Sequence, residues 1–225
     1  MAKISKHDLK EDKFVTFMFR LWDYMRDNSS YFFGIVIIII ILLGAVYGYF
    51  SFRKNMEETR VEMLGEAEFK MRFEDYQAAD SILTNLVENH GSTIPGKKAT
   101  FYLANLNLSK MGDYDRALEL FEQYLQNPIE GNQEFIISAK AGIAASKEEK
   151  REFEEAASMY MELYDEYPNY FDRESLLLAA GRCYTYGNKI QQATDAYQRF
   201  IQNHEDSQNL DKAQIALAYV KSLQM

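Results

Sequence analysis

The side chains best suited to chemistry are scattered along this 225-residue sequence. The three histidines, His7, His90 and His204, lie far apart and show no metal-binding spacing such as HExxH. The single cysteine, Cys183, can form neither an intramolecular disulfide nor a cysteine-based zinc site. We therefore predict no metal site in this chain.

The acidic residues show no catalytic arrangement either. Pairs such as Glu148-Glu149 and Glu154-Glu155 fall in segments of helical periodicity, where a solvated helix face explains them. No GxGxxG, GxxxxGK[ST] or GxSxG motif occurs, so the sequence offers no phosphate-binding loop and no nucleophile elbow. We predict a protein with no catalytic residues, no cofactor and no small-molecule substrate.

The charge is unevenly distributed. Residues 1–52 carry six basic and five acidic side chains, whereas residues 53–225 carry 19 basic and 29 acidic ones. A net charge of −9 argues against nucleic acid as a partner, because binding to phosphates requires a clustered basic surface. The high aromatic content, 14%, indicates a folded chain.

One segment, residues 31–52, reads YFFGIVIIIIILLGAVYGYFSF and contains no charged residue. As a helix it would be about 33 Å long, enough to cross a bilayer core of about 30 Å. A buried core helix is disfavoured because Ile35 to Leu43 has no polar face. A cleaved signal peptide is disfavoured because 30 residues precede the segment and its apolar stretch is too long. We predict a single transmembrane helix at 31–52, between an N-terminal tail (1–30) and a C-terminal domain (53–225).

Two further features concern the membrane. Within the span, Gly44 and Gly48 form a GxxxG motif, on which another transmembrane helix could pack closely. Before the span, between Asp12 and Asp27, apolar residues recur at helical spacing and predict an amphipathic helix. This helix could lie on the membrane surface, dock on a membrane partner, or pack against its own anchor. Its apolar residues are Phe14, Phe17, Met18, Leu21, Trp22 and Met25.

The region after the span contains internal repeats. Four segments, at 74–83, 112–121, 151–160 and 188–197, share an aromatic residue or Ile, then an alanine, then a large apolar residue. The alanines are Ala79, Ala117, Ala156 and Ala193, spaced 38, 39 and 37 residues apart. A second amphipathic helix precedes each segment, and the three prolines, Pro95, Pro128 and Pro168, mark the boundaries between repeats. The pattern predicts an all-α solenoid of about four helical hairpins.

These repeats resemble tetratricopeptide repeats. The matching positions are Gly112-Asp113-Tyr114, Ala117, Phe121, Pro168, Gly181 and Tyr184. The array covers about residues 57–205, and residues 209–225 resemble the solubilising cap helix. The period is longer than the usual 34 residues, and Glu74 stands where the motif prefers glycine.

The whole arrangement resembles the YfgM-type ancillary subunits of the bacterial Sec translocon. The resemblance implies a single-pass protein of the bacterial inner membrane with a cytoplasmic tail and a periplasmic repeat domain. It also implies the translocon, polypeptide clients and membrane lipid as partners. A more remote resemblance, in repeat style alone, is to the periplasmic coordinator of the Tol–Pal system.

The basic residues beside the span favour the opposite orientation. Near the N-terminal side are Lys13, Arg20 and Arg26, and near the C-terminal side are Arg53, Lys54, Arg60, Lys70 and Arg72. This excess after the span favours a cytoplasmic repeat domain. The sequence alone leaves the orientation open.

By register with the motif, the first helix of each pair lines a concave groove. The groove residues predicted in this way are Leu64, Glu68, Met71, Tyr102, Leu106, Ser109, Leu178, Arg182 and Tyr186. This mainly apolar lining suits extended, partly hydrophobic polypeptide. The alternative is a structural scaffold of a stable membrane complex, with the groove filled by a fixed partner.

The segment between the span and the first repeat is predicted to be helical. No proline occurs between Phe52 and Phe73, and Gly65 is the only glycine there. Flexible tethers are rich in Gly and Ser instead. We predict one nearly continuous helix from about Tyr31 to Arg72.

Overall fold

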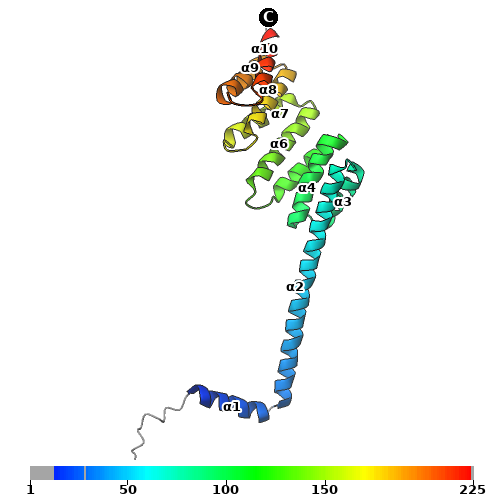
Figure 1. Cartoon of the computed structure of the whole chain (residues 1–225), viewed down its shortest axis with the longest axis vertical. Helices are drawn as coiled ribbons and strands as arrows, with labels where there is room; N and C mark the ends of the chain where they lie inside the picture. Colours follow the sequence, from blue (N-terminus) through cyan, green and yellow to red (C-terminus); the bar gives the residue numbers. More distant parts are fainter. Residues whose placement is uncertain (1–12, 28, 224–225) are drawn as a thin grey trace, which may run out of the picture. The chain divides into compact units, whose positions relative to one another are not determined.

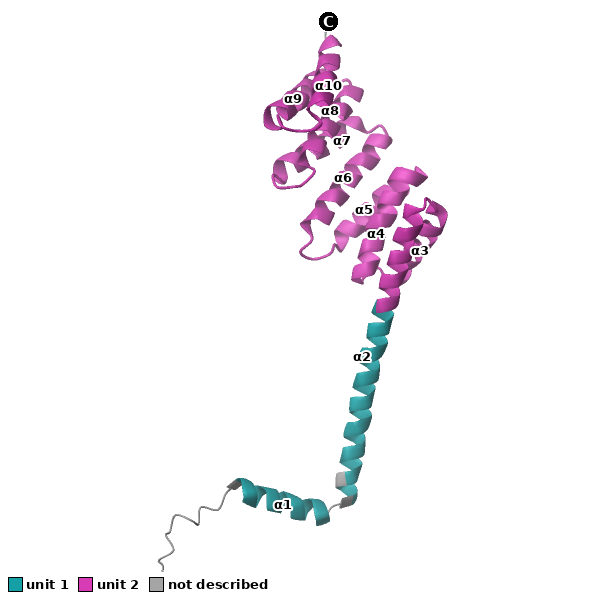
Figure 2. Cartoon of the chain, in the orientation of Figure 1, with its two compact units in different colours: residues 1–57 teal, residues 58–225 magenta. Residues whose placement is uncertain are grey.

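The computed structural model describes residues 13–27 and 29–223. These residues form ten α-helices and one π-helical segment, with no strand among them (Figure 1). The chain divides into two compact units, residues 1–57 and residues 58–225 (Figure 2). The predicted all-α fold is confirmed.

The first unit contains α1 (Lys13–Asp27) and the N-terminal part of α2 (Ser29–Arg72). The apolar side chains of α1 are largely exposed, as the amphipathic pattern predicts, while Asp12 lies outside the described residues. Among the described residues, one helix, α2, is long and apolar enough to cross a membrane. None of its most apolar window is buried within the protein, which argues against a core helix.

The second unit is a stack of helix pairs (Figure 1). The end of α2 packs with α3, since Leu64 and Ala67 share a hydrophobic core with Ala79 and Leu83. The remaining elements are α3 (Tyr76–His90), α4 (Ile94–Leu106) with the π-helical segment η1 (Asn107–Met111), α5 (Tyr114–Gln126), α6 (Gln133–Glu149), α7 (Phe153–Glu166), α8 (Arg173–Tyr186), α9 (Ile190–Asn203) and α10 (Leu210–Ser222). The structure thus contains the four predicted hairpins and the closing helix.

Small residues allow these helices to approach one another closely. The four repeat alanines, Ala79, Ala117, Ala156 and Ala193, are all fully buried. The ring of Phe121 on α5 lies so close to Gly142 on α6 that a Cβ atom there would sit 2.3 Å from it. A Cβ atom at Gly181 would likewise sit 2.6 Å from the Tyr197 ring. Any side chain at these glycines would force the helices apart.

Each hairpin turn uses one residue in the left-handed region. These residues are Glu74, Gly112, Arg151 and Asn188, with φ between 56° and 70°, and each lies five residues before a repeat alanine. Asp75 and Asp113 follow the first two and cap α3 and α5 by accepting hydrogen bonds from Ala78 N and Arg116 N. Pro128 and Pro168 lie between hairpins as predicted, whereas Pro95 lies in the first turn of α4.

Candidate functional site

Four of the predicted groove residues line one pocket. Met71 near the end of α2, Tyr102 and Leu106 of α4, and Ser109 of η1 surround a cavity of about 320 Å³. The other lining residues are Tyr76, Phe101, Asn105 and Lys110. This volume lies in the range of sites that hold small molecules or single large side chains.

The pocket combines an aromatic lining with a polar edge. Burial, and then the nearby Glu68 carboxylate, raise the pKa of the Tyr102 hydroxyl, so this group stays protonated near neutral pH. The Lys110 ammonium group lies 5.6 Å from the centre of the Tyr76 ring. Such an arrangement suits a large apolar side chain that enters from solvent with polar neighbours.

The π-helical segment η1 shapes this pocket. It widens the last turn of α4, where Asn107 is buried and donates a hydrogen bond from Nδ2 to Leu103 O at 2.8 Å. Ser109 and Lys110, both in this turn, face the pocket. Single π-helical turns occur often at functional sites. No residue pattern in the sequence indicated it.

Three predicted groove residues serve mainly in packing, which corrects the interpretation of them as open positions. Leu64 is 7% exposed and Leu106 is 3% exposed, so both belong to the hydrophobic core, although Leu106 also touches the pocket. Leu178 packs against two core clusters. The physical reason is that one side of each first helix rests on the following helix, and periodicity does not distinguish that side from the groove side.

In the C-terminal half, Arg182 is engaged in an ion pair. Its Nε and Nη2 atoms donate to Glu148 Oε1 and Oε2 at 2.6 and 2.8 Å. The Glu148 side chain is only 11% exposed and also accepts a hydrogen bond from Tyr160 Oη at 3.4 Å. The hydrogen bonds to Glu148 raise the pKa of the Arg182 guanidinium. Burial raises the pKa of the thiol of Cys183, the next residue in the chain. The positive charge of the Arg182 guanidinium is therefore balanced by the Glu148 carboxylate.

Tyr186 lies at the mouth of a second cavity, of about 430 Å³. Its ring centre is 5.4 Å from that of Phe153, and Glu148, Glu149 and Arg151 complete the lining. The sequence predicted a solvated helix face for Glu148, which is wrong, since its side chain is 11% exposed and lines this cavity. Glu148 lies 39 residues after Ser109, the same interval as from Ala117 to Ala156, so the repeat register could have found it.

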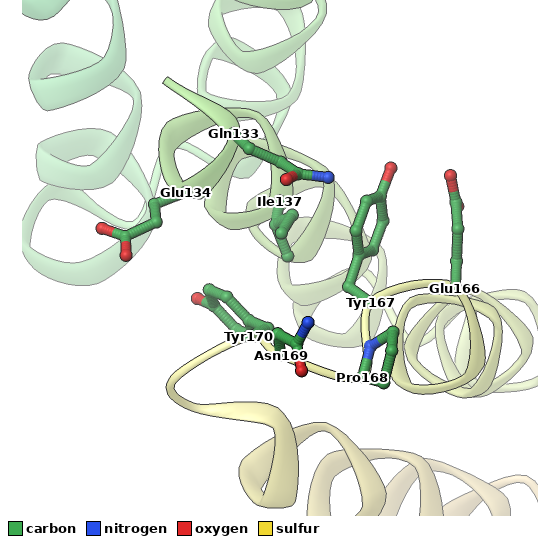
Figure 3. Close-up of a pocket in the computed structure, with 8 residues that line it drawn as sticks. All are labelled: Gln133, Glu134, Ile137, Glu166, Tyr167, Pro168, Asn169 and Tyr170. Atoms are coloured by element: carbon green, nitrogen blue, oxygen red, sulfur yellow. The ribbon is translucent and has the colours of Figure 1, made fainter. Parts of the chain in front are cut away.

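A third cavity, of about 210 Å³, lies between the start of α6 and the segment after α7. In Figure 3, Tyr167 and Tyr170 lie to either side of Ile137. Lys140 Nζ donates to Tyr167 Oη at 2.9 Å, and the hydroxyls of Ser138 and Tyr170 are 3.1 Å apart. These hydrogen bonds connect α6 to the segment that follows α7. The cavity is below the usual size of a ligand site.

Two other features of the sequence are His204, which has a structural role, and the Gly44 and Gly48 motif, whose role stays a prediction. His204 directly follows α9, its Nε2 atom lies 3.1 Å from Tyr164 Oη, and burial lowers the pKa of its imidazole. Gly44 and Gly48 are exposed on α2, with nothing within 4 Å of a Cβ built at either. Their role in packing another transmembrane helix stays a prediction.

Comparison with known proteins identifies the repeat type. A family model described as a tetratricopeptide repeat-like domain matches residues 23–222. No curated protein matches the chain.

Solved structures share the fold. The crystal structure of BtubC (BKLC) from P. vanneervenii is 19% identical, covers 69% of each chain and has a TM-score of 0.57. MamA 41-end from Desulfovibrio magneticus RS-1 is 13% identical, covers 73% of this chain and 94% of its own, and has a TM-score of 0.55. The chain belongs to the tetratricopeptide repeat-like domain family.

Proposed function

We propose that this protein is a membrane-anchored, non-enzymatic interaction module that binds polypeptide in the groove of its repeat domain. Tetratricopeptide repeat-like domains mediate protein–protein interaction, and their concave face is the usual binding surface. Its role would be accessory to protein export or envelope assembly at the bacterial inner membrane. Its partners would include other membrane proteins, with the Sec translocon as the candidate that the resemblance suggests.

The observation that carries this proposal is the pocket of about 320 Å³ around Tyr102 and Ser109. It is open to solvent at Ser109, and its aromatic walls can take one large apolar side chain of a bound chain. Apolar pockets at protein–protein interfaces hold the anchor residues that dominate affinity. A groove that binds the C-terminal carboxylate of a peptide needs an available cation, whereas Arg182 is already paired with Glu148. This pairing is consistent with a groove that binds apolar side chains instead.

Membrane lipid is the second proposed partner. The exposed apolar residues of α1, including Phe17, Met18 and Trp22, would lie in the bilayer surface. Only Asn28 separates α1 from α2, so α1 stays close to the start of the proposed span.

Site-specific photocrosslinking in cells tests the groove. A photoreactive phenylalanine analogue at Ser109 should capture many different polypeptides, which disappear during a chase as clients are released. The matched control is Gln123, an exposed position on α5. A second variant, Ser109→Trp, should fill the pocket and reduce crosslinking from an analogue placed at Met71, whereas Gln123→Trp should not.

The outcome separates the two candidate functions. A single persistent crosslinked protein would support the fixed-partner scaffold instead of a transient client. Equal crosslinking from Ser109 and Gln123 would remove the groove as the binding site.

A further inference from the structure

The outer face of α2 in the repeat domain carries an apolar stripe. Val61, Gly65 and Phe69 follow one another at intervals of four residues, which places them on one side of the helix. Phe73 comes four residues after Phe69, directly after the end of α2, and its backbone N–H donates to Phe69 O at 3.1 Å. Val61, Phe69 and Phe73 are 55%, 56% and 66% exposed, and the ring centres of the two phenylalanines are 4.5 Å apart. We call these four residues the outer stripe.

The position of Phe69 is buried in every later repeat. Phe69 lies five residues before the left-handed residue Glu74. The residues five before Gly112, Arg151 and Asn188 are Asn107, Ser146 and Cys183, and each is at most 1% exposed. A repeat position that is buried three times is therefore open in the first repeat alone.

The third repeat also shows what covers this face. Gly65 lies nine residues before Glu74, as Gly142 lies nine before Arg151. At Gly142, the Phe121 ring from the preceding helix α5 rests directly on the glycine. At Gly65, a built Cβ meets nothing within 4 Å. The first repeat thus keeps the glycine slot for an aromatic ring, without the helix that would supply the ring.

Charge indicates the nature of the missing helix. Glu62 and Glu66 are exposed and lie one turn apart beside the outer stripe, whereas the basic residues Lys70 and Arg72 lie in the last turn of α2. Two copies of α2 anchored in one bilayer with the same orientation would lie parallel and bring these glutamates together, and like charges at a helix contact are destabilising. A helix with basic residues on its flank would be stabilised instead.

We propose that the outer stripe of α2 is the docking site for an amphipathic helix of another protein. This helix places an aromatic side chain over Gly65 and Lys or Arg beside Glu62 and Glu66. The stripe begins nine residues after Phe52, the end of the proposed span, so a membrane protein with a helix next to the bilayer is the class of partner that fits. The site is separate from the groove and needs no client there.

Binding of synthetic helices to the full-length protein in lipid nanodiscs tests this proposal. Two fluorescent peptides carry the same Leu and Phe stripe, one flanked by Lys and the other by Glu, and empty nanodiscs measure binding to lipid. We expect the Lys-flanked peptide to bind more tightly, with an affinity that falls as salt increases.

Two variants should weaken that binding at least about tenfold, because they remove or block a central anchor. Gly65→Gln fills the slot at a position where the free protein has space, and Phe69→Ser removes the largest apolar contact. Ser109→Trp in the groove should leave the affinity unchanged, which separates failure of this site from failure of the proposed function.

Three results would overturn the proposal. One is equal binding of the two peptides, and another is unchanged affinity in both stripe variants. The third is a disulfide-linked homodimer of Phe69→Cys in a Cys183→Ser background, which would assign the outer stripe to a second copy of this chain.

Discussion

The four hairpin turns adopt one left-handed backbone conformation with four different residues. Gly112 has no Cβ and accepts it at no steric cost, and Asn188 is among the side chains that tolerate it. Glu74 and Arg151 adopt the same conformation, with φ of 61° and 65°, although their Cβ atoms oppose it. The penalty is about 1 kcal/mol per residue, which the packing of the adjoining helices offsets.

At the residue scale, we predict that Arg151→Gly stabilises the repeat domain. Glycine removes the left-handed strain from the folded state, but it also increases the conformational entropy of the unfolded chain. The first effect should be larger, so the free energy of unfolding should rise by roughly 0.5 kcal/mol. The apparent melting temperature of the purified protein should therefore rise by about 1–2 °C. Arg151→Ala, which keeps the Cβ atom, is the matched control and should show no such rise, and a lower melting temperature for Arg151→Gly would contradict the strain argument.

At the element scale, α2 runs without interruption from Ser29 to Arg72. This confirms the helix predicted from Tyr31 to Arg72 and adds two residues at its start. The cause is local, since residues 53–64 contain neither proline nor glycine and maintain helical hydrogen bonding. The unit boundary between Glu57 and Glu58 therefore falls inside a helix and not in a loop.

We predict that this continuity is needed for function. A short Gly-Ser insertion after Lys54 should reduce client crosslinking from Ser109, because the groove would no longer be held by a stiff element. The melting temperature of the repeat domain should stay unchanged, since its core begins at Leu64. The control is a variant in which the residues next to the insertion site are replaced by alanines, which keeps α2 continuous. Normal crosslinking after the insertion, with rapid amide exchange at residues 53–60, would show that α2 acts as a simple tether.

At the scale of the whole molecule, the orientation of the proposed membrane anchor would decide which polypeptides can reach the groove. The basic residues beside the span favour a cytoplasmic repeat domain, whereas the family resemblance favours a periplasmic one. Large domains can be translocated despite flanking positive charge. The basic residues after the proposed span are therefore compatible with either orientation.

We predict that the repeat domain is periplasmic. Protease added to intact spheroplasts should digest it, while a cytoplasmic marker protein stays protected. Digestion only after lysis would place the domain in the cytoplasm. That result would leave the groove intact as a binding site but would rule out exported polypeptides as its clients.

Features that depend on local chemistry were determined by the sequence alone. An uncharged segment of 22 residues predicts a membrane-spanning helix, because its length and composition match a bilayer core, and the structure contains a helix there that is long and apolar enough to cross one. Alanines at intervals of 38, 39 and 37 residues are sufficient to predict the helix pairs, because only small residues permit such close packing. These signals lie within one helix or recur along the chain, so no long-range contact is needed to interpret them.

Only the tertiary structure decided which helix faces are open. Leu64 and Met71 share one apolar pattern on α2, yet Leu64 is buried and Met71 lines a pocket. Arg182 was predicted to be an open groove residue and is paired with Glu148, 34 residues away. Periodicity shows which residues share a helix face, but the neighbouring helix that covers the face is set by packing between distant parts of the chain. For the same reason, the outer stripe became visible only by comparison with the three later repeats, where the positions equivalent to Gly65 and Phe69 are buried.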